Sequence, residues 1–296
     1  MIKSLARLML PRPLWRQLRA WKLQRVLNRF RPYLVEHDYA GVRLKVRITD
    51  PLAMGWYDHP WKPMREVDLL RSAGLVTGAR VFDLGAHQGV VAMILAHHVG
   101  PTGEVIAVEA LPQNARICED NRDLNGLRRV WVESAAIADH AGELDVTIGL
   151  NGSVRNRTST ITSVRVPAVT IDDLADKYGQ PDVLFVDVEG YECHALRGAR
   201  RVLSRFPDCY VEIHRGCGLE SAGGTLASVF DFFPRERYKL RVWSDTEHSP
   251  RQVVGPSECP AGGRVYLVAV RRDSRSDALS QGQNCPFPGE PTLRLS

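Results

Sequence analysis

Residues 81–89 of this 296-residue chain read Val-Phe-Asp-Leu-Gly-Ala-His-Gln-Gly. An apolar run ends here in the carboxylate of Asp83, and a loop of small residues then leads into the apolar segment Gly89–His98. Glycine lets the loop bend sharply and lets the next helix begin close to the strand. The stretch therefore predicts a strand, a tight loop and a helix, which together form the repeating unit of a doubly wound α/β sheet.

The same alternation of strands and helices continues along the chain. The predicted strands are Arg80–Leu84, Glu104–Glu109, Val130–Ser134, Asp182–Asp187, Cys209–His214, Lys239–Trp243 and Arg264–Val270. The predicted helices are Met64–Ala73, Gly89–His98, Pro112–Leu124 and Glu192–Phe206. Continuous apolar runs suit parallel strands that are covered on both faces, so we predict a mainly parallel, seven-stranded sheet.

An insertion separates the third and fourth strands of this sheet. Residues 142–171 alternate between apolar and polar types, which predicts an antiparallel pair of strands around a polar loop at Asn151–Thr160. We interpret this insertion as a candidate substrate-side element. A further strand is predicted at residues 42–46, before the main sheet begins.

Acidic residues close the first two strands, at Asp83 and Glu109. A carboxylate at the end of the second strand accepts hydrogen bonds from ribose hydroxyls in sheets that bind either nicotinamide cofactors or adenosylmethionine. The loop distinguishes the two classes, because a dinucleotide fingerprint is Gly-x-Gly-x-x-Gly whereas the order here is Asp-x-Gly-x-x-x-Gly. S-adenosylmethionine has no phosphate to seat, so we predict that Asp83, Gly85, Gly89 and Glu109 bind it. An NAD(P)-dependent oxidoreductase is the alternative.

A second group of polar residues is predicted on the opposite side of the crevice. Asp187 closes the fourth strand and would face Asp83 if the fourth and first strands are neighbours. Glu212 and His214 share one face of the fifth strand. Methyl transfer to an alcohol requires a base, and we predict His214 in that role, with Glu212 to orient it and Asp187 beside it. His214 as a simple strand cap and Asp187 as an organiser of its loop remain alternatives.

Two more acids follow Asp187. We interpret Glu189 and Glu192 as residues that favour the start of the next helix through its dipole. Asp187, Glu189, Glu212 and His214 offer oxygen and imidazole ligands, but the sequence has no local ligand motif, and no metal is predicted.

Ordered motifs along residues 57–214 carry a family resemblance. They are Val81-Phe82-Asp83-Leu84-Gly85-Ala86-x-x-Gly89, Glu109-x-x-Pro112, Val169-Thr170-Ile171-Asp172-Asp173-Leu174, Phe185-Val186-Asp187-Val188-Glu189-Gly190-x-Glu192-x-x-x-Leu196-x-Gly198-Ala199 and Glu212-x-His214. This combination resembles the FkbM family of methyltransferases. The resemblance implies the class I methyltransferase (Rossmann-like) architecture, S-adenosylmethionine as cofactor, and transfer to a hydroxyl of a sugar, glycolipid, polyketide or other secondary metabolite.

The resemblance also extends the predicted cofactor site. It implies that Ser134 and Ala135, which follow the third strand, lie by the adenine, and it adds the loop residues Ala86 and His87. Many family members have Asn where this chain has His87. That residue is therefore interpreted as either a cofactor contact or a structural member of the loop.

Basic charge gathers near the N-terminus, where residues 1–50 hold 12 Lys and Arg against 3 Asp and Glu. We predict a basic helical arm or appendage over residues 1–50, a methyltransferase domain over residues 51–271 and a disordered tail over residues 272–296. Residues 1–31 mix basic and apolar side chains, which suits peripheral contact with an anionic membrane. The apolar side chains form no single clean face, however, and a solvated or domain-packing helix is the alternative. Three aromatic residues follow this appendage, namely Trp56, Tyr57 and Trp61.

Composition bears on the remaining classes. No signal-like apolar run precedes Pro11 and no stretch approaches the ~20 apolar residues of a membrane span, so we predict a cytoplasmic protein. The six scattered cysteines predict reduced thiols. The fourth strand lacks the Asp/Asn-Pro-Pro-aromatic ending typical of amino-group methylation, and no nucleic-acid partner is predicted. A non-catalytic scaffold that docks through its basic arm is the alternative from outside the enzymes.

Overall fold

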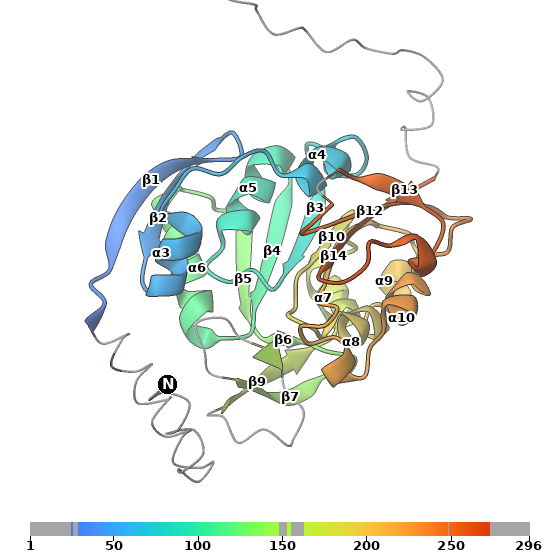
Figure 1. Cartoon of the computed structure of the whole chain (residues 1–296). Helices are drawn as coiled ribbons and strands as arrows, with labels where there is room; N and C mark the ends of the chain where they lie inside the picture. The colour runs from blue at the N-terminus through green and yellow to red at the C-terminus, as the bar shows by residue number, and fades with distance from the viewer. Residues whose placement is uncertain (1–24, 26–28, 148–152, 155–162, 248, 273–296) are drawn as a thin grey trace, which may run out of the picture.

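A computed structural model describes residue 25 and residues 29–147, 153–154, 163–247 and 249–272 (Figure 1). Its central sheet is mixed, mainly parallel and eight-stranded, with the order β13-β12-β14-β11-β10-β3-β4-β5. The strands are β3 (Arg80–Leu84), β4 (Glu104–Glu109), β5 (Val130–Ser134), β10 (Val183–Val186), β11 (Asp208–Ile213), β12 (Tyr238–Ser244), β13 (Arg251–Val253) and β14 (Val265–Arg271). All seven predicted strands are present, and the short β13 adds an eighth beside β12. The predicted doubly wound α/β class is confirmed.

The winding of the sheet reverses between β3 and β10. From β3 the chain adds β4 and then β5 as parallel neighbours on one side, and it later places β10 and β11 on the other side. Strand β14 runs antiparallel to both β11 and β12. Asp83 pairs with Phe185 across β3 and β10, and Asp187 directly follows β10, so the first and fourth predicted strands are neighbours, which is the condition for Asp187 to face Asp83. Ligands of such sheets bind at this reversal, outside the carboxyl ends of the strands.

Strand side chains alternate between two helical layers. Val81 is buried in a core with α4 (Arg65–Arg71), α5 (Val90–Val99) and α6 (Pro112–Leu124). Phe82, the next residue, is buried in the opposite core with α7 (Ile171–Tyr178), α8 (Glu192–Arg197), α9 (Arg200–Leu203) and α10 (Leu226–Phe230). Each fully buried side chain of this kind stabilises the fold by about 1.5–3 kcal/mol. Two short 3₁₀ helices complete the second half of the chain, η1 (Glu220–Ala222) and η2 (Pro256–Glu258).

The single helix predicted over Glu192–Phe206 is wrong, because the chain forms two short helices, α8 and α9, with a break at Gly198. A Cβ on Gly198 would lie 2.2 Å from the carbonyl oxygen of Ala138, so the backbone passes very close to another segment there. The carboxylate of Asp172 then accepts from the backbone N–H of Arg201 at 3.0 Å and caps the new helix.

The insertion forms a separate four-stranded sheet with the order β6-β9-β7-β8, below the main sheet in Figure 1. Its strands are β6 (Ala136–Ile137), β7 (Gly142–Thr147), β8 (Ser153–Val154) and β9 (Ser163–Val169). Strands β7 and β9 are the predicted antiparallel pair. Most of the predicted loop at Asn151–Thr160 lies outside the described residues. Ile171 begins α7 rather than ending a strand, because Thr170 forms a capping box with Asp173.

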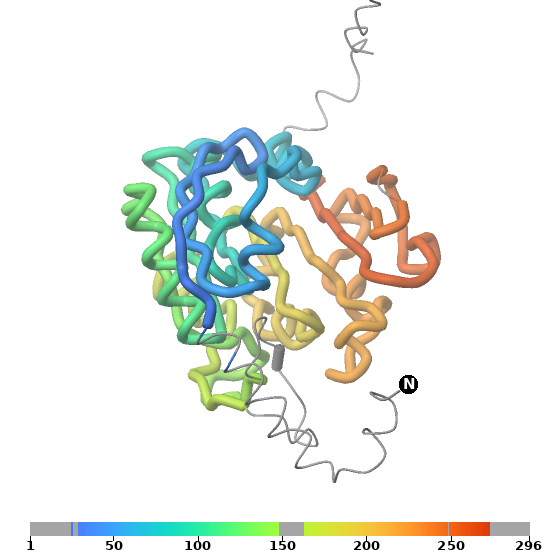
Figure 2. The backbone as a smooth tube through the Cα atoms, turned by 60° about the vertical axis from the view of Figure 1, so that its left-hand side comes forward, coloured from blue at the N-terminus to red at the C-terminus, as the bar shows by residue number. Residues whose placement is uncertain are grey.

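An N-terminal hairpin covers the outer side of α5, along the flank of the molecule in Figure 2. It consists of β1 (Tyr33–Tyr39) and β2 (Val42–Ile48), and α3 (Pro51–Tyr57) follows it. The sequence predicts only the strand over residues 42–46. The backbone N–H of Arg47 donates to Asn121 Oδ1 of α6 at 2.8 Å, which helps to fix the hairpin to the main core.

Several predictions concern other parts of the chain. Most of the basic arm, in residues 1–24 and 26–28, lies outside the described residues, as does the predicted tail beyond residue 272. In the described part of the chain, no helix combines the length and the apolar character that crossing a membrane requires. The five cysteines described there are free thiols, in line with the prediction. The bounds of the three predicted domains stay predictions.

Candidate functional site

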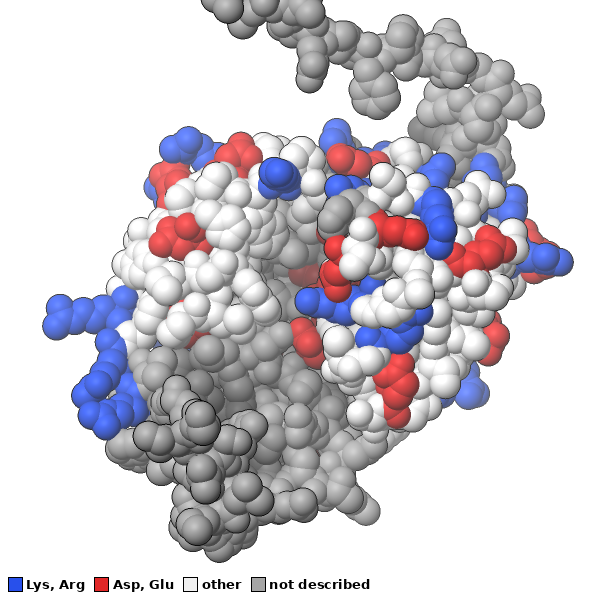
Figure 3. All heavy atoms as spheres, viewed as in Figure 1, with Lys and Arg blue, Asp and Glu red and all other residues white. Residues whose placement is uncertain are grey.

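A pocket of about 290 Å³ lies at the carboxyl ends of β3, β4, β10 and β11. Eight of the predicted site residues line it: Asp83, Gly85, Ala86, His87, Glu109, Ala135, Asp187 and Glu212. Three do not line it: Gly89, Ser134 and His214. Figure 3 shows this face of the molecule, hollowed near its centre, with acidic and basic side chains beside the hollow.

Asp83 brings a buried carboxylate to the pocket wall. Its side chain extends from β3, only 2% of the residue is exposed, and Oδ2 has no hydrogen-bond partner. Burial, together with the negative charge of Glu109, raises the pKa of Asp83 to about 7. A carboxylate in this state is ready to accept a cation or a hydrogen-bond donor from a ligand.

Glu109 closes β4 and organises the loop opposite it. Its Oε2 accepts from the backbone N–H of His87 at 2.9 Å, and its Oε1 accepts from the backbone N–H of Leu111 at 2.8 Å. Burial raises the pKa of Glu109 to about 6, although these hydrogen bonds favour the charged form. A carboxylate has about four acceptor positions, so these two backbone contacts leave room for a ligand.

The two loop glycines are required by the protein's own packing. Gly85 has φ +96°, and a Cβ there would lie 1.7 Å from the carbonyl oxygen of Asp187. Gly89 has φ +86°, and a Cβ there would lie 2.4 Å from Cys118 Sγ in α6. The sequence predicts both glycines as cofactor-binding residues that also let the next helix begin close to the strand, and the contacts seen here are of the second kind, within the chain. Gly85 joins the β3 loop to the β10 loop, and Gly89 seats the start of α5 against α6.

His87 is held by aromatic residues from α3. Its Nδ1 lies 2.8 Å from the Tyr57 hydroxyl, and its ring centroid lies 5.1 Å from that of Trp56. Trp56, Tyr57 and Trp61 all line the pocket. The sequence places this aromatic stretch directly after the basic appendage and gives it no role, and no motif connects it with the glycine loop. The only available signal is its aromatic density.

On the opposite side of the pocket, His214 lies among four carboxylates. Its Nδ1 is 2.8 Å from Glu192 Oε1, which also accepts from the backbone N–H of Gly190 at 2.8 Å. Glu192 is fully buried, and its contact with His214 joins α8 to the end of β11. The carboxylate that holds the imidazole is therefore Glu192, whereas the sequence assigns this role to Glu212 and explains Glu192 by a helix dipole.

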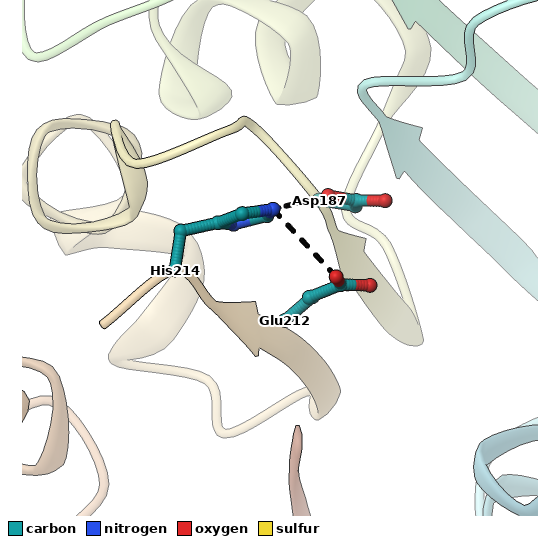
Figure 4. A group of neighbouring side chains, drawn as sticks. All are labelled: Asp187, Glu212 and His214. Atoms are coloured by element: carbon teal, nitrogen blue, oxygen red, sulfur yellow. Dashed lines mark ion pairs between the residues drawn. The ribbon is translucent and has the colours of Figure 1, made fainter. Parts of the chain in front are cut away.

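The other ring nitrogen of His214 faces three acids at longer range. Nε2 lies 3.4 Å from Glu189 Oε2, 3.6 Å from Glu212 Oε1 and 3.7 Å from Asp187 Oδ1. Figure 4 shows the imidazole of His214 directed at the carboxylates of Asp187 and Glu212. Neither His214 Nε2 nor Asp187 Oδ1 has a hydrogen-bond partner.

These contacts change the proton affinities of the group. Burial alone lowers the pKa of His214, but the hydrogen bond and charge of Glu192, with the charges of Asp187 and Glu189, outweigh it and raise this pKa to about 9. Burial and the charge of Glu212 raise the pKa of Asp187 well above its usual value.

Arg264 is a further pocket residue that the sequence does not single out. It precedes β14, and its Nη1 donates to Glu212 Oε1 at 2.6 Å. It is the only Lys or Arg among the described residues that line the pocket. The positive charge in the pocket is therefore confined to the side of Glu212 and Asp187.

Part of the chain matches a known protein family. A model of the methyltransferase FkbM domain matches residues 83–240, about half of the chain. No curated protein matches the sequence.

Solved structures show more distant likenesses. The methyltransferase FkbM from Methylobacillus flagellatus KT is 16% identical with a TM-score of 0.41, over 64% of this chain and 43% of that one, so this chain spans less than half of its length. A SAM-dependent methyltransferase from Aquifex aeolicus is 16% identical with a TM-score of 0.40, over 75% and 93% of the two chains. A SAM-dependent O-methyltransferase from Thermotoga maritima is 13% identical with a TM-score of 0.40, over 80% and 77%.

Proposed function

The chain belongs to the FkbM family of S-adenosylmethionine-dependent methyltransferases, and on that premise we propose that it methylates a hydroxyl oxygen of a sugar, glycolipid or secondary metabolite. The observation that carries the assignment of its cofactor site is the pair of buried carboxylates, Asp83 and Glu109, on one wall of the pocket at the sheet reversal. When bound, S-adenosylmethionine supplies a methyl group on a positively charged sulfur.

The pocket residues fit this cofactor. Asp83 Oδ2 lacks a partner and would pair with the cofactor's ammonium group. Glu109 keeps acceptor positions beyond its two backbone contacts and would accept from the ribose hydroxyls. Ala86, His87 and Ala135 line the same wall and would bound the nucleoside. In this proposal Gly85 and Gly89 shape the loop, and Ser134 acts only through the backbone at the end of β5.

Charge favours this cofactor over a dinucleotide. The loop that would seat a pyrophosphate is bordered by the buried acids Asp83 and Glu109. Arg264, the one basic side chain on the described pocket wall apart from His87, contacts Glu212 on the other side. A phosphate group in this loop would meet like charge.

Asp187, Glu212 and His214 form the transfer side of the proposed site. An acceptor hydroxyl must lose its proton as its oxygen attacks, and correctly placed groups supply most of the rate. Asp187 and Glu212 line the pocket, whereas His214 does not and is only 2% exposed. We therefore assign contact with the acceptor to the two carboxylates and treat His214 as a positioning residue behind them.

The acceptor class rests on the family and on the aromatic residues of α3 and the segment after it. Trp56, which is 39% exposed, and Trp61 line the pocket, and aromatic rings in such a place can pack against the hydrocarbon face of a sugar ring. Three parts of the proposal rest on the sequence alone. They are peripheral membrane contact through residues 1–31, a cytoplasmic location and the absence of a nucleic-acid partner.

The test is calorimetric binding of S-adenosylhomocysteine to the full chain. Asp83→Asn and Glu109→Gln should each weaken binding at pH 8 by at least about tenfold, the cost of one lost charge-assisted contact. Glu133→Gln is the matched control, because Glu133 bonds Lys177 and Tyr178 and does not line the pocket. Unchanged affinity in both site variants, or tight NADH binding that S-adenosylhomocysteine cannot displace, would contradict the proposal. Transfer of labelled methyl groups to glycolipid or polyketide fractions then identifies the acceptor.

A further inference from the structure

Three potential ligand atoms from two adjacent strand ends converge on one point. They belong to Asp187, Glu212 and His214, and all three atoms lie within 4.8 Å of one another (Figure 4). His214 is 2% exposed, and its Nε2 is buried without a hydrogen-bond partner. The described residues offer this nitrogen only longer contacts, at 3.4 Å to Glu189, 3.6 Å to Glu212 and 3.7 Å to Asp187.

We propose that Asp187, Glu212 and His214 bind a divalent transition-metal cation. Two carboxylate oxygens and one imidazole nitrogen are a donor set that suits Mn²⁺ or Zn²⁺. The separations also fit. His214 Nε2 lies 3.7 Å from Asp187 Oδ1 and 3.6 Å from Glu212 Oε1, which is too far for a hydrogen bond. Bonds of about 2.1 Å to a shared ion would subtend about 120° at that ion for these separations.

Glu192 provides the outer support that a metal-binding histidine requires. A ligating imidazole almost always gives its other N–H to a carboxylate or carbonyl, which fixes the tautomer and the ring plane. His214 Nδ1 lies 2.8 Å from Glu192 Oε1, inside the protein, and this contact leaves Nε2 as the nitrogen that faces the pocket side. In the neutral imidazole, the form that binds a metal, the lone pair of Nε2 is directed at Asp187 and Glu212.

The local charge also calls for a cation. Asp187, Glu189, Glu192 and Glu212 all lie within 4 Å of the His214 ring nitrogens. Of these four acids Arg264 contacts only Glu212, on the Oε1 atom, which has a second lone pair for an ion; its Nε lies 3.8 Å from Asp245. The single guanidinium of Arg264 does not balance the negative charge of these carboxylates, and a divalent ion on the Nε2 side would compensate the remainder.

The position of the ion suits a role in methyl transfer, and this role rests on the proposed function. Asp187 and Glu212 line the pocket while His214 lies behind them, so the open side of the ion would face the acceptor. A metal ion lowers the pKa of a bound water from about 16 to about 7, and it acts on a bound hydroxyl in the same way. The hydroxyl proton would pass to the carboxylate of Glu189, which lines the pocket and is not one of the three ligands, while the ion holds the oxygen that receives the methyl group.

The experiment uses the full chain, stripped with a chelator and titrated with Mn²⁺ alone, and the electron paramagnetic resonance signal of free Mn²⁺ is measured. The wild type should bind one Mn²⁺ and show a nitrogen hyperfine coupling from the imidazole. His214→Ala should abolish that coupling. Glu212→Gln, which keeps the shape of the side chain, should weaken binding by at least about tenfold. Zn²⁺ should displace the bound Mn²⁺.

Two matched controls share the features of the altered residues. His37→Ala removes another carboxylate-paired histidine, which bonds Asp58 at 3.0 Å, and Glu66→Gln removes another acid near Glu212. Both should bind Mn²⁺ like the wild type. A wild type that binds neither Mn²⁺ nor Zn²⁺, or binding that survives both site variants, overturns the metal site. Binding of S-adenosylhomocysteine is measured for each protein, because it reports folding and separates the metal site from the proposed function. A chain that binds S-adenosylhomocysteine but no metal refutes only the metal site. A chain that binds metal but no S-adenosylhomocysteine refutes only the proposed function.

Discussion

Replacement of Asp83 by asparagine should stabilise the cofactor-free protein and also remove most of the pH dependence of cofactor binding. Both effects arise from the same buried carboxylate, whose pKa is raised from 3.8 to about 7 by burial and by the charge of Glu109. Because the folded-state pKa lies above the unfolded value, the ionised form destabilises the fold. Protonated Asp83 does not destabilise the fold, so the full free energy of unfolding is present below about pH 4. Part of it is lost as the pH rises towards 7 and the burial of the carboxylate begins to oppose its ionisation.

The raised pKa sets the size of the stability effect. A difference of about three pKa units corresponds to about 4 kcal/mol of destabilisation above pH 7. The asparagine side chain cannot ionise, so the stability difference between Asp83→Asn and the wild type should grow by about 3 kcal/mol between pH 5 and pH 8. Urea unfolding of both proteins at the two pH values measures it.

Cofactor binding should also depend on the ionisation of Asp83, but here the ionised form should be the favourable one. With a pKa of about 7, roughly 90% of Asp83 is ionised at pH 8 and roughly 10% at pH 6. The affinity of the wild type should therefore fall about tenfold between these pH values, and Asp83→Asn should show no such fall. The cofactor's own amine titrates at about pH 8, but it does so for both proteins, so the ratio of their dissociation constants isolates Asp83.

Calorimetry in two buffers of different ionisation enthalpy provides the decisive readout. At pH 7 the wild type should release about half a proton from Asp83 on binding, since the cationic ligand favours the carboxylate form. The reasoning fails if Asp83→Asn is less stable than the wild type at pH 8, or if both proteins show the same pH profile of binding.

Three further predictions rest on particular contacts. Gly85→Ala places a Cβ 1.7 Å from the Asp187 carbonyl oxygen at φ +96°, and it should lower the free energy of unfolding in urea by at least about 3 kcal/mol. The control Gly55→Ala, which has open space around it, should change that free energy by less than about 1 kcal/mol. Equal effects of the two substitutions would contradict the packing argument. Tyr57→Phe removes the contact with His87 Nδ1 and should weaken product binding by about fivefold in calorimetry, while Tyr33→Phe, which loses a bond to Asp58, should not; the reverse order would refute a role for α3. Glu192→Gln should weaken Mn²⁺ binding by about 10–100-fold in the resonance titration, and an unchanged affinity would remove Glu192 from the support of His214.

The parts of the fold that could be predicted are those whose signals are local. Buried parallel strands such as Val183–Val186 are continuous apolar runs, and their order follows from alternation with helices. The break at Gly198 could not be predicted, because its cause is the carbonyl of Ala138, 60 residues away in the chain. The hairpin strand Tyr33–Tyr39 is not predicted because three consecutive polar residues, Glu36, His37 and Asp38, interrupt the alternation of apolar and polar residues.

The candidate site divides in the same way. Asp83, Glu109 and Asp187 could be predicted as pocket residues because each stands at the end of an apolar run, and parallel strands end at one edge of the sheet. The partnership of Glu192 with His214 could not, because it joins a helix start to a strand end 22 residues later. The role of Tyr57 depends on α3 packing across α5, which no motif indicates.

The unpartnered atoms of the pocket explain why two kinds of ligand are expected. A buried carboxylate oxygen without a hydrogen bond destabilises a fold, by about 1–3 kcal/mol or more when charged, and folded proteins keep such atoms mainly at functional sites. Asp83 Oδ2 lies on the wall formed by β3 and β4, whereas Asp187 Oδ1 and His214 Nε2 lie on the side formed by β10 and β11. An organic cation that pairs with Asp83 does not complete the second group, where either a proton on His214 Nε2 or a metal ion can use the lone pair of that nitrogen. The cofactor would therefore complete the first wall, and a metal ion that displaces the Nε2 proton would complete the second.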